Sequence, residues 1–323
     1  MTVDEATLRR GLGLTLDRTA LDHLGPRVEG KVRDAYRLGG GRRVLVTTDR
    51  ISAFDRVLGT LPFKGQVLNQ LSAWWFEATA DVAPNHRLAV PDPAATLALE
   101  CEPLPVEWVM RAYLTGVTST SIWTHYQAGE RVFCGHRLPD GLRKNEPLPE
   151  PLLTPSTKAG AGGHDRSVSR AEVLASGALD EGTFDEAARM AAALFARGQA
   201  VCQARGLILV DTKYEIGRAP DGQLRVIDEI HTPDSSRLWF DRSYEASLAE
   251  GAEPESFDKE HVRRWLASVG FTGEGAPPPL PDDLRVEAAR RYLEACEAIR
   301  GEPFVPDLED PTSRLSRTLG ALR

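Results

Sequence analysis

The pattern of hydrophobic and polar positions is clearest between Gly206 and Trp239. Four aliphatic residues start a strand at Leu207, and apolar and polar positions then alternate, so the two kinds of side chain face opposite sides of a sheet. Asp221-Gly222 is a strong signal for a two-residue turn, and a second aliphatic strand starts at Leu224. The segment is therefore predicted to form a β-hairpin. The polar side of its first strand carries Asp211, Lys213 and Glu215.

The predicted register of this hairpin places two carboxylates against each other. If Asp221 and Gly222 form the tip, Glu215 lies directly opposite Asp228. Like charges at roughly 5 Å across a ladder destabilise a sheet, so a cation is expected between them. Mg²⁺ is usually held by one or two carboxylates plus substrate phosphates. Lys213, on the same face, suits an anionic substrate or a developing negative charge.

Two other interpretations of the hairpin remain open. In the first, Glu215 and Asp228 are solvated members of a salt-bridged surface hairpin, because structural ion networks resemble sites. In the second, residues 217–223 hold a longer loop or a bulge, and the register changes. The return strand leads directly into residues 231–237, which are dense in hydrogen-bonding groups. Loops on a rigid scaffold are where chemistry tends to lie, which favours a site here.

Similar patterns predict the remaining elements. Residues 27–38 and 42–48 are typical of two strands, and the three glycines between them predict a second hairpin. The stretch 103–111 is typical of a proline-stiffened crossover that enters a buried strand, which is a candidate boundary between two lobes. Residues 135–155 are rich in proline, glycine and charge and are predicted to form a long loop. Helices are predicted over 67–78, 116–127, after capping boxes at Ser169 and Thr183, and over 257–269 and 282–300.

Candidate phosphate contacts lie in the first hairpin. Gly30 would weaken a strand unless something approaches the backbone there, and Lys31 and Arg33 lie beside it on one face. A glycine flanked by cations suits a phosphate that lies over a strand, although exposed cations on strands are common. The chain has neither a Walker A sequence nor GxGxxG, which disfavours a P-loop or Rossmann site. At the crossover, Glu107 and Arg111 are either a boundary ion pair or ligands for a nucleotide between the lobes.

Composition narrows the functional class. The chain has 323 residues, enough for two domains or one large one with an ample core. Its net charge of -8 argues against a general surface for nucleic acid or anionic membranes, so any anion site must be local. Four widely spaced cysteines without a CxxC pair indicate reduced thiols in a cytoplasmic protein. Neither a signal peptide nor an apolar run of roughly 20 residues is evident, so no membrane span is expected.

Seven segments, taken in order, resemble the SAICAR synthetase (phosphoribosylaminoimidazole-succinocarboxamide synthase) family. They are GKVRDAY (30–36), TDRISAFD (48–55), LPFKGQVLNQLSAWWF (61–76), CEPLPVEWVMRAYLTG (101–116), TPSTKAGAGGHD (154–165), GLILVDTKYEIG (206–217) and VIDEIHTPDSSRLW (226–239). The resemblance implies an α+β fold with ATP in a cleft between two lobes. An N-terminal antiparallel β-sheet lobe is expected over 1–104. A larger mixed α/β lobe is expected over 105–323, with C-terminal helices from about residue 241.

The resemblance also implies a reaction, with ATP, Mg²⁺, a carboxyaminoimidazole ribonucleotide and L-aspartate as ligands. ATP activates the ribonucleotide carboxylate, as an acyl phosphate, and the aspartate amine then attacks to give the succinocarboxamide, ADP and phosphate. Phosphoryl transfer depends mostly on positioning and on neutralising charge. The residues expected to hold the nucleotide are Gly30, Lys31, Val32, Arg33, Glu107, Lys158, Glu215 and Asp228. Glu215 and Asp228 are the expected metal ligands.

The same resemblance assigns residues to the reacting groups. Lys213 and Asp228 are the expected catalytic residues, with Lys213 neutralising the carboxylate while it is activated. The residues expected to contact the substrates are Ser52, Asp55, Arg111, Ser119, Asp165, Lys213, Asp234, Ser235 and Arg237. Arg111 and Arg237 suit the ribonucleotide phosphate because a guanidinium fork fits it well. Family members commonly have a hydroxyl residue where this chain has Val117, so either Thr118 or Ser119 replaces that hydroxyl or the contact is absent.

Two rival functions share part of this set. A small-molecule kinase of related fold would use Lys31, Glu215 and Asp228 without an amine acceptor, so dependence on L-aspartate separates it from a ligase. A non-catalytic nucleotide-binding protein would bind ATP without turnover and would leave the paired carboxylates unexplained. The expected partners are small molecules, with neither nucleic acid nor membrane among them. The oligomeric state is left open.

Overall fold

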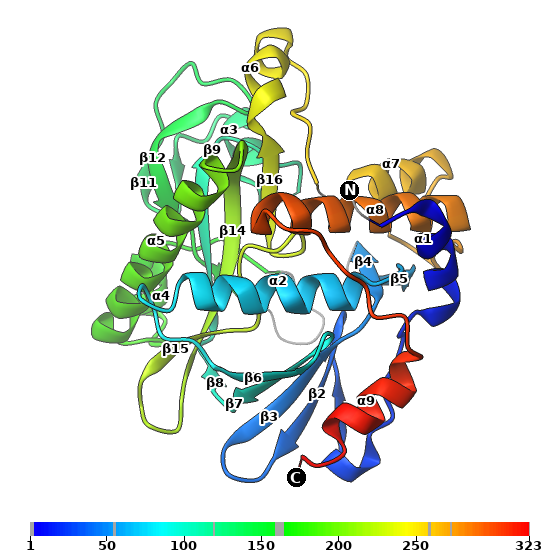
Figure 1. Ribbon diagram of the computed structural model, residues 1–323. Helices are drawn as coiled ribbons and strands as arrows, with labels where there is room; N and C mark the ends of the chain where they lie inside the picture. Colours follow the sequence, from blue (N-terminus) through cyan, green and yellow to red (C-terminus); the bar gives the residue numbers. More distant parts are fainter. Residues whose placement is uncertain are drawn as a thin grey trace.

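The computed structural model describes residues 3–53, 56–118, 120–158, 165–257, 260–271 and 273–322. Figure 1 shows helix α2 (Lys64–Ala78) lying between an N-terminal sheet and helix α8 (Asp282–Arg300). The strands that the structure describes form two large sheets and two two-stranded sheets, β4 (Arg50–Ala53) with β5 (Arg56–Thr60) and β10 (Val132–Phe133) with β11 (His136–Arg137). Every pairing between these strands is antiparallel. The predicted α+β class is confirmed.

A five-stranded sheet forms the N-terminal lobe, in the order β1-β2-β3-β7-β6. Its strands are β1 (Arg27–Glu29), β2 (Arg33–Leu38), β3 (Arg42–Thr47), β6 (Arg87–Asp92) and β7 (Ala95–Leu99). The elements around it are α1 (Glu5–Gly11), η1 (Leu12–Leu14), η2 (Asp22–Leu24) and the hairpin of β4 (Arg50–Ala53) with β5 (Arg56–Thr60).

The stretch 27–38 is not the single strand that the sequence predicted. The chain reverses at Lys31 and Val32, and β1 folds back on β2. The Gly30 N–H closes this tight turn by donating to the Arg33 carbonyl over 2.7 Å. A Cβ at Gly30 would lie 3.0 Å from the same oxygen, so the turn favours glycine. The expected phosphate contacts therefore lie at a hairpin tip.

A seven-stranded sheet forms the second lobe around the long strand β14 (Leu207–Arg218). Strands β8 (Glu102–Pro103), β9 (Val106–Tyr113), β15 (Leu224–Ile227) and β16 (Ser236–Phe240) pair with β14, and β12 (Pro147–Leu153) and β13 (Ser156–Thr157) pair with β9. Helix α5 (Glu181–Gln203) packs against β14 and β9 (Figure 1). The other elements are α3 (Ile122–Gln127), β10 (Val132–Phe133), β11 (His136–Arg137), α4 (Arg170–Ala175), α6 (Asp241–Glu250), α7 (Glu260–Ser268) and α9 (Pro311–Leu319).

The hairpin of β14 and β15 has a three-residue turn in place of the predicted two-residue turn. The Gly222 N–H donates to the Ala219 carbonyl over 2.9 Å. Gly222 has a φ of 84°, the left-handed conformation that closes three-residue hairpin loops. The extra loop residue shifts the register by one, so Glu215 pairs with Ile227. The predicted opposition of Glu215 and Asp228 is therefore wrong.

The helix and loop predictions are confirmed only in part. The capping box at Ser169 is present. Asp180 caps α5, and Thr183 lies inside the helix, because the Thr183 N–H donates to the Asp180 carboxylate. The predicted loop over 135–155 contains β11 and the seven-residue strand β12. The helix expected over 116–127 begins only at Ile122, and the Ser121 N–H just before it donates to the Thr118 carbonyl over 3.0 Å.

The C-terminal helices contact both lobes. Helix α8 packs against α2, and α9 packs against β6. Arg314 of α9 donates through Nε to Asp92 Oδ2 over 3.0 Å, in an ion pair that is almost fully buried. Leu315 and Leu319 complete the hydrophobic core under the N-terminal sheet. The division of the chain into two domains at residue 104 stays a prediction.

Gly65→Ala is expected to destabilise the protein. Gly65 lies in the first turn of α2 against the backbone of Thr47, and a Cβ there would overlap the Thr47 carbonyl oxygen. Overpacking of this kind costs about 1–3 kcal/mol, so the midpoint of urea unfolding should fall. Gly13→Ala is the matched control, because no described atom lies within 4 Å of a Cβ at Gly13. Equal effects of the two substitutions would contradict the prediction.

Candidate active site

The polar face of the central sheet assembles the charged residues of the candidate site. In the register of β9 and β14, Arg111 pairs with Asp211 and Val109 pairs with Lys213. Strand β16 adds Arg237, which pairs with Asp211 from the other side. The residues that alternate with these are buried, and α5 packs on that face. The predicted separation of polar and apolar side chains is confirmed from Asp211 to Ile216. It is wrong for Val210, because a register shift between Leu209 and Asp211 places Val210 in another hydrophobic cluster, with Trp239 and Tyr244.

Lys213 lies at the centre of this face. Its Nζ donates to Glu107 Oε1 over 2.8 Å and to Glu215 Oε1 over 3.0 Å. Lys158 Nζ donates to the other oxygen of Glu215 over 2.5 Å. The pairing of β9 with β14 ends at Trp108 opposite Tyr214, and the shared contact with Lys213 Nζ brings the carboxylates of the next residues, Glu107 and Glu215, close together. A cation does lie between two carboxylates of neighbouring strands, but it is an ammonium group and the pair does not include Asp228.

Burial and ion pairing together set the protonation of these groups. Burial alone lowers the pKa of Lys213, but the carboxylates of Glu215 and Glu107 outweigh it and hold that pKa above its ordinary value. Burial alone raises the pKa of Glu215, but the ammonium groups of Lys213 and Lys158 lower it to about 2. Lys213 and Glu215 are therefore both charged at neutral pH. A phosphate chain would compete with Glu215 for the two lysines.

The loop after β15 presents two further carboxylates. Asp228 has a φ of 69° and His231 a φ of 53°, left-handed conformations that residues other than glycine rarely adopt. The buried His231 anchors this loop, with Nε2 2.6 Å from the hydroxyl of Tyr214. Arg33 of β2 forms an ion pair with Asp228 and another, at 2.7 Å, with Glu229 Oε1. The N-terminal hairpin thus contacts this loop of the second lobe directly.

A cavity of about 220 Å³ lies where these two lobes meet. It brings together Gly30 and Arg33 of the N-terminal hairpin with Glu215 and Asp228 of the central sheet. Lys31 and Val32 are not among its lining residues. Their carbonyls accept hydrogen bonds from residues 50 and 48, which fix the hairpin tip, and their contact with a nucleotide stays a prediction.

The two carboxylates that line this cavity fit the ligand set expected for Mg²⁺. Among the described residues, no group of three or more His, Cys, Asp or Glu side chains is arranged to hold a metal ion. Mg²⁺ does not require such a cage, because it is usually bound by one or two carboxylates together with substrate phosphates. Glu215 and Asp228 line one cavity with the cations that a phosphate would need. The site is therefore compatible with Mg²⁺ held by these two carboxylates together with substrate phosphates.

Asp211 lies between the two arginines expected to bind the ribonucleotide. Arg237 Nη1 lies 3.2 Å from Asp211 Oδ2, and Arg111 is the cross-strand partner of Asp211. Arg111 is held in place by a hydrogen bond from Nε to Thr154 Oγ1 over 2.8 Å. The sequence analysis did not assign Asp211, although it lies on the predicted polar face.

Asp234 and Ser235 lie in the internal bonding of the loop before β16. Asp234 Oδ2 accepts from Lys64 Nζ over 2.8 Å, and Oδ1 accepts from the hydroxyl of Tyr292 over 2.5 Å. The Asp234 side chain is only 5% exposed. Ser235 Oγ accepts a backbone N–H of the same loop over 3.1 Å. The structure thus gives Asp234 a supporting role, and direct contact with a substrate stays a prediction for both residues.

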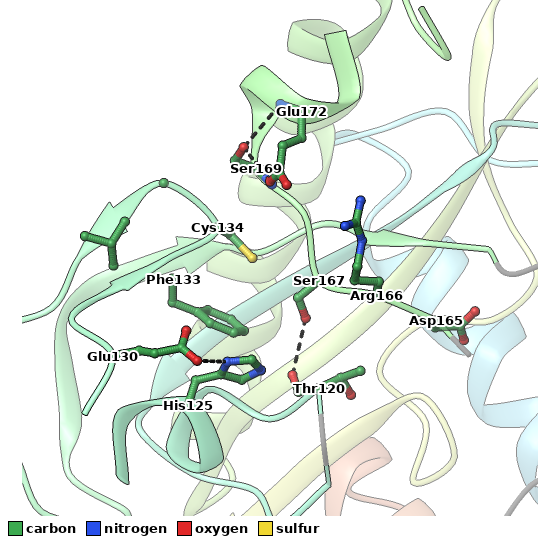
Figure 2. Close-up of a pocket in the computed structure, with 12 residues that line it drawn as sticks. Thr120, His125, Glu130, Phe133, Cys134, Asp165, Arg166, Ser167, Ser169 and Glu172 are labelled. Carbon is green, nitrogen blue, oxygen red and sulfur yellow. Dashed lines mark hydrogen bonds and ion pairs between the residues drawn. The ribbon is translucent and has the colours of Figure 1, made fainter. Parts of the chain in front are cut away.

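The structure does not bring every expected substrate contact to this face. Ser52 lies on β4 and is not among the described residues that line the 220 Å³ cavity. Asp165 lines a separate cavity of about 540 Å³, on the opposite side of Figure 2 from the ion pair of His125 with Glu130. Asp55 and Ser119 lie outside the described residues.

Several residues of the site were missed by the sequence analysis. Lys64 and Glu229 lie inside the motifs that carry the family resemblance, so those motifs could have drawn attention to them. Arg264 and Arg291 of α7 and α8 line a further cavity that also includes Arg237. No local sequence signal indicates that these two helices line a cavity with Arg237, because amphipathic periodicity identifies a helix but not the elements that it packs against.

The α+β fold and the charged cavity between its two large sheets are compatible with an enzyme that binds anionic ligands. Comparisons with known proteins define the class further. The family model for SAICAR synthetase matches residues 26–279. A phosphoribosylaminoimidazole-succinocarboxamide synthase of Legionella pneumophila (strain Lens) is 49% identical over 88% of this chain and 90% of that protein. One from Bacteroides thetaiotaomicron is 44% identical over 86% of this chain and 88% of that protein.

A solved structure gives the same result. The SAICAR synthase from Saccharomyces cerevisiae, complexed with SAICAR, is 29% identical, with a TM-score of 0.78 over 90% of this chain and 100% of that one. The chain belongs to the SAICAR synthetase family. It is therefore an enzyme of the ligase class that serves purine biosynthesis, and the rival functions are not favoured.

The ion pairs of Glu215 predict how stability responds to acid. The pKa of Glu215 is about 2 in the folded chain and ordinarily 4.5, so its ion pairs stabilise the fold above pH 4.5 and lose this effect as the pH falls toward 2. Such a shift corresponds to at most about 3 kcal/mol. The difference in unfolding free energy between the native chain and Glu215→Gln should be largest at neutral pH and shrink in acid. A difference that does not vary with pH would contradict this.

Proposed function

We propose that this chain joins L-aspartate to 5-amino-1-(5-phosphoribosyl)imidazole-4-carboxylate with hydrolysis of ATP, giving SAICAR, ADP and phosphate. One observation carries the proposal. Glu215, Lys213 and Asp211 project in sequence from one face of β14, with the cavity under the N-terminal hairpin at one end and Arg237 at the other. Family membership supports the same assignment.

In the proposed first step, an oxygen of the imidazole carboxylate attacks the γ-phosphorus of ATP. The bond from that phosphorus to the bridging oxygen breaks, ADP leaves, and an acyl phosphate forms. Lys213 faces the carboxylate and neutralises its charge, which matters because phosphoryl transfer depends on positioning and on charge neutralisation. Gly30 and Arg33 cover the phosphates from the N-terminal hairpin, and Lys158 neutralises them from the second lobe.

Mg²⁺ would add neutralising charge to the phosphates, with Glu215 and Asp228 as its protein ligands. The residues now paired with those carboxylates support this assignment. Arg33 holds Asp228, and Lys158 and Lys213 hold Glu215. These cations are the groups that incoming phosphates would attract, which leaves the two carboxylates available to a metal.

In the proposed second step, the amine of L-aspartate attacks the acyl carbon. The bond between that carbon and the phosphate oxygen breaks, phosphate leaves with the electron pair, and the nitrogen loses a proton. Arg111 and Arg237 hold the ribonucleotide in place. Arg237 lies two residues along the sheet from Lys213 and one strand across, so the Cα atoms of the two residues are about 8 Å apart. That distance suits the imidazole and ribose that separate a carboxylate from a 5′-phosphate.

A coupled assay of ADP release tests the proposal against its main rival. The assay contains ATP, Mg²⁺, L-aspartate and the ribonucleotide, and each component is omitted in turn. The ligase requires all four, whereas a small-molecule kinase releases ADP without L-aspartate. ADP release at an undiminished rate without L-aspartate would count against the ligase, and no turnover under any condition would refute an enzymatic role.

The proposed working compartment is the cytoplasm. All four cysteines are free, as expected in a reducing environment. In the described part of the chain, none of the helices has the length and apolar character needed to cross a bilayer. Fractionation of cells that produce the native chain tests this assignment.

Asp228→Asn is expected to abolish Mg²⁺-dependent turnover while the protein stays folded. The substitution removes a metal ligand, and losing one such electrostatic partner costs about 100-fold or more in kcat. Asparagine tolerates the left-handed conformation at this position, so the loop should keep its shape. Asp221→Asn, at the exposed turn of the same hairpin, is the matched control and should stay near native activity. Native activity in Asp228→Asn would remove the metal role.

A further inference from the structure

The most informative unassigned feature is the side chain of Arg50, at the start of β4. Arg50 lies in the TDRISAFD segment but is not among the residues expected to touch ATP or the substrates. Its side chain is only 4% exposed. A buried guanidinium costs free energy unless its N–H groups have acceptors, so those acceptors show what this side chain holds in place.

Two of the acceptors are carbonyl oxygens at the tip of the N-terminal hairpin. Arg50 Nη2 donates to the Gly30 carbonyl over 2.9 Å, and Nε donates to the Lys31 carbonyl over 3.1 Å. The hydroxyl and the N–H of Thr48 donate to the next carbonyl, that of Val32, over 2.8 and 2.9 Å. The turn between β3 and β4 therefore binds three successive carbonyls of the tip.

The other bonds of Arg50 anchor it within the N-terminal lobe. Nη2 also donates to Asp34 Oδ1 over 2.8 Å, and Nη1 donates to the Asp17 carbonyl. The buried Asp34 accepts with its second oxygen from the N–H and the hydroxyl of Thr19, over 2.9 and 2.7 Å. Burial alone raises the pKa of Asp34, but the hydrogen bonds from Thr19 and Arg50 outweigh it and lower that pKa. A charged carboxylate thus holds the guanidinium in place.

The bonds to the carbonyls also set the direction of the N–H groups at the tip. Every peptide bond of the described residues is trans, so each N–H points away from the C=O of the same peptide. Because the Gly30 and Lys31 carbonyls point to Arg50, the N–H groups of Lys31 and Val32 point away from it. Successive backbone N–H groups of this kind form concave sites that bind anions.

The tip lies at the edge of the cavity proposed for the phosphates. Gly30 and Arg33, which flank the two central residues of the tip, line the 220 Å³ cavity together with two carboxylates of the second lobe. Because the tip is short, a rotation of its peptides changes the distance from their N–H groups to any phosphate in this cavity. The bonds from Arg50 oppose such a rotation.

We propose that Arg50 is a positioning residue of the nucleotide site, which fixes the hairpin tip so that the N–H groups of Lys31 and Val32 donate to the phosphates of ATP. This inference rests on the proposed function, which places those phosphates under the hairpin. A guanidinium suits the role because its adjacent Nε and Nη2 groups bind two successive carbonyls in a fixed geometry. An ammonium group is a point charge on a flexible stem and does not hold two peptides in this way.

Calorimetric titration of the full chain with ADP and with adenosine, in the presence of Mg²⁺, tests the proposal without turnover. The native protein should bind ADP more tightly than adenosine, because only ADP has phosphates to reach the tip. Arg50→Lys keeps a positive charge beside Asp34, so it should lower this preference for ADP by about tenfold while adenosine binds as it does to the native chain. Thr19→Val is the matched control, because it removes a buried hydrogen bond to the same carboxylate without touching the tip.

Steady-state kinetics provide the second readout. Arg50→Lys should raise KM for ATP by about tenfold and lower kcat, because the γ-phosphate is held less precisely, with KM for the ribonucleotide near its native value. If Arg50 only stabilised the fold, binding of ADP and adenosine would weaken alike and KM for both substrates would rise. That outcome would overturn the proposal.

Two further outcomes would overturn it. One is an equal preference for ADP over adenosine in Arg50→Lys and Thr19→Val, and the other is a native chain that binds ADP no better than adenosine. If Arg50→Lys fails to fold, Thr48→Val decides, because it removes the hydroxyl bond to the Val32 carbonyl and should lower the preference for ADP by about threefold. A native preference in Thr48→Val then refutes the proposal. Loss of the ADP preference in Arg50→Lys, with no succinocarboxamide formed by the native chain, would refute the proposed function but retain the role of Arg50.

Discussion

The ion pairs around Lys213 are the interaction on which the candidate site depends. Neighbouring strands place Glu107 and Glu215 side by side, and only a cation between them makes that arrangement stable. The groups are partly buried, where removing one partner is costly because it leaves a charge without compensation. Lys213 therefore stabilises the sheet and is also the residue proposed to neutralise the substrate carboxylate. A substrate anion that pairs with Lys213 removes the cation shared by Glu107 and Glu215. Positive charge must therefore enter with the substrate to neutralise these two carboxylates.

The rest of the site is assembled around this centre from segments that lie far apart in the sequence. The N-terminal hairpin contributes Arg33, the loop after β15 contributes Asp228, and the hydrogen bond of Tyr214 with His231 fixes that loop. Tyr292 then fixes α8 against the next part of the same loop. Each segment is positioned by a buried or partly buried polar contact, so the site is held before any ligand binds, which reduces the entropy lost on binding.

The sequence predicted the charged face of β14, but it could not predict which residues of other strands and helices lie against that face. Alternation along β14 is a local property, and it correctly separated Lys213 and Glu215 from the buried side. The register was wrong because Asp221-Gly222 is compatible with both a two-residue and a three-residue turn, and a single residue changes every cross-strand pair. Strand β9, which supplies Glu107, pairs with β14 from about 100 residues earlier in the chain. The sequences of helices α7 and α8 contain no local signal for the cavity that these helices line.

The position of the last helix has a consequence for how the chain can fold during its synthesis. The core under the N-terminal sheet includes Leu315 and Leu319, and the buried carboxylate of Asp92 has Arg314 as its cation. Domains generally fold as units with the N-terminal one first while the ribosome is still adding residues. Here the N-terminal lobe lacks part of its core and a buried countercharge until helix α9 emerges. The N-terminal lobe, although it is made first, is thus among the last parts of the chain to reach its finished structure.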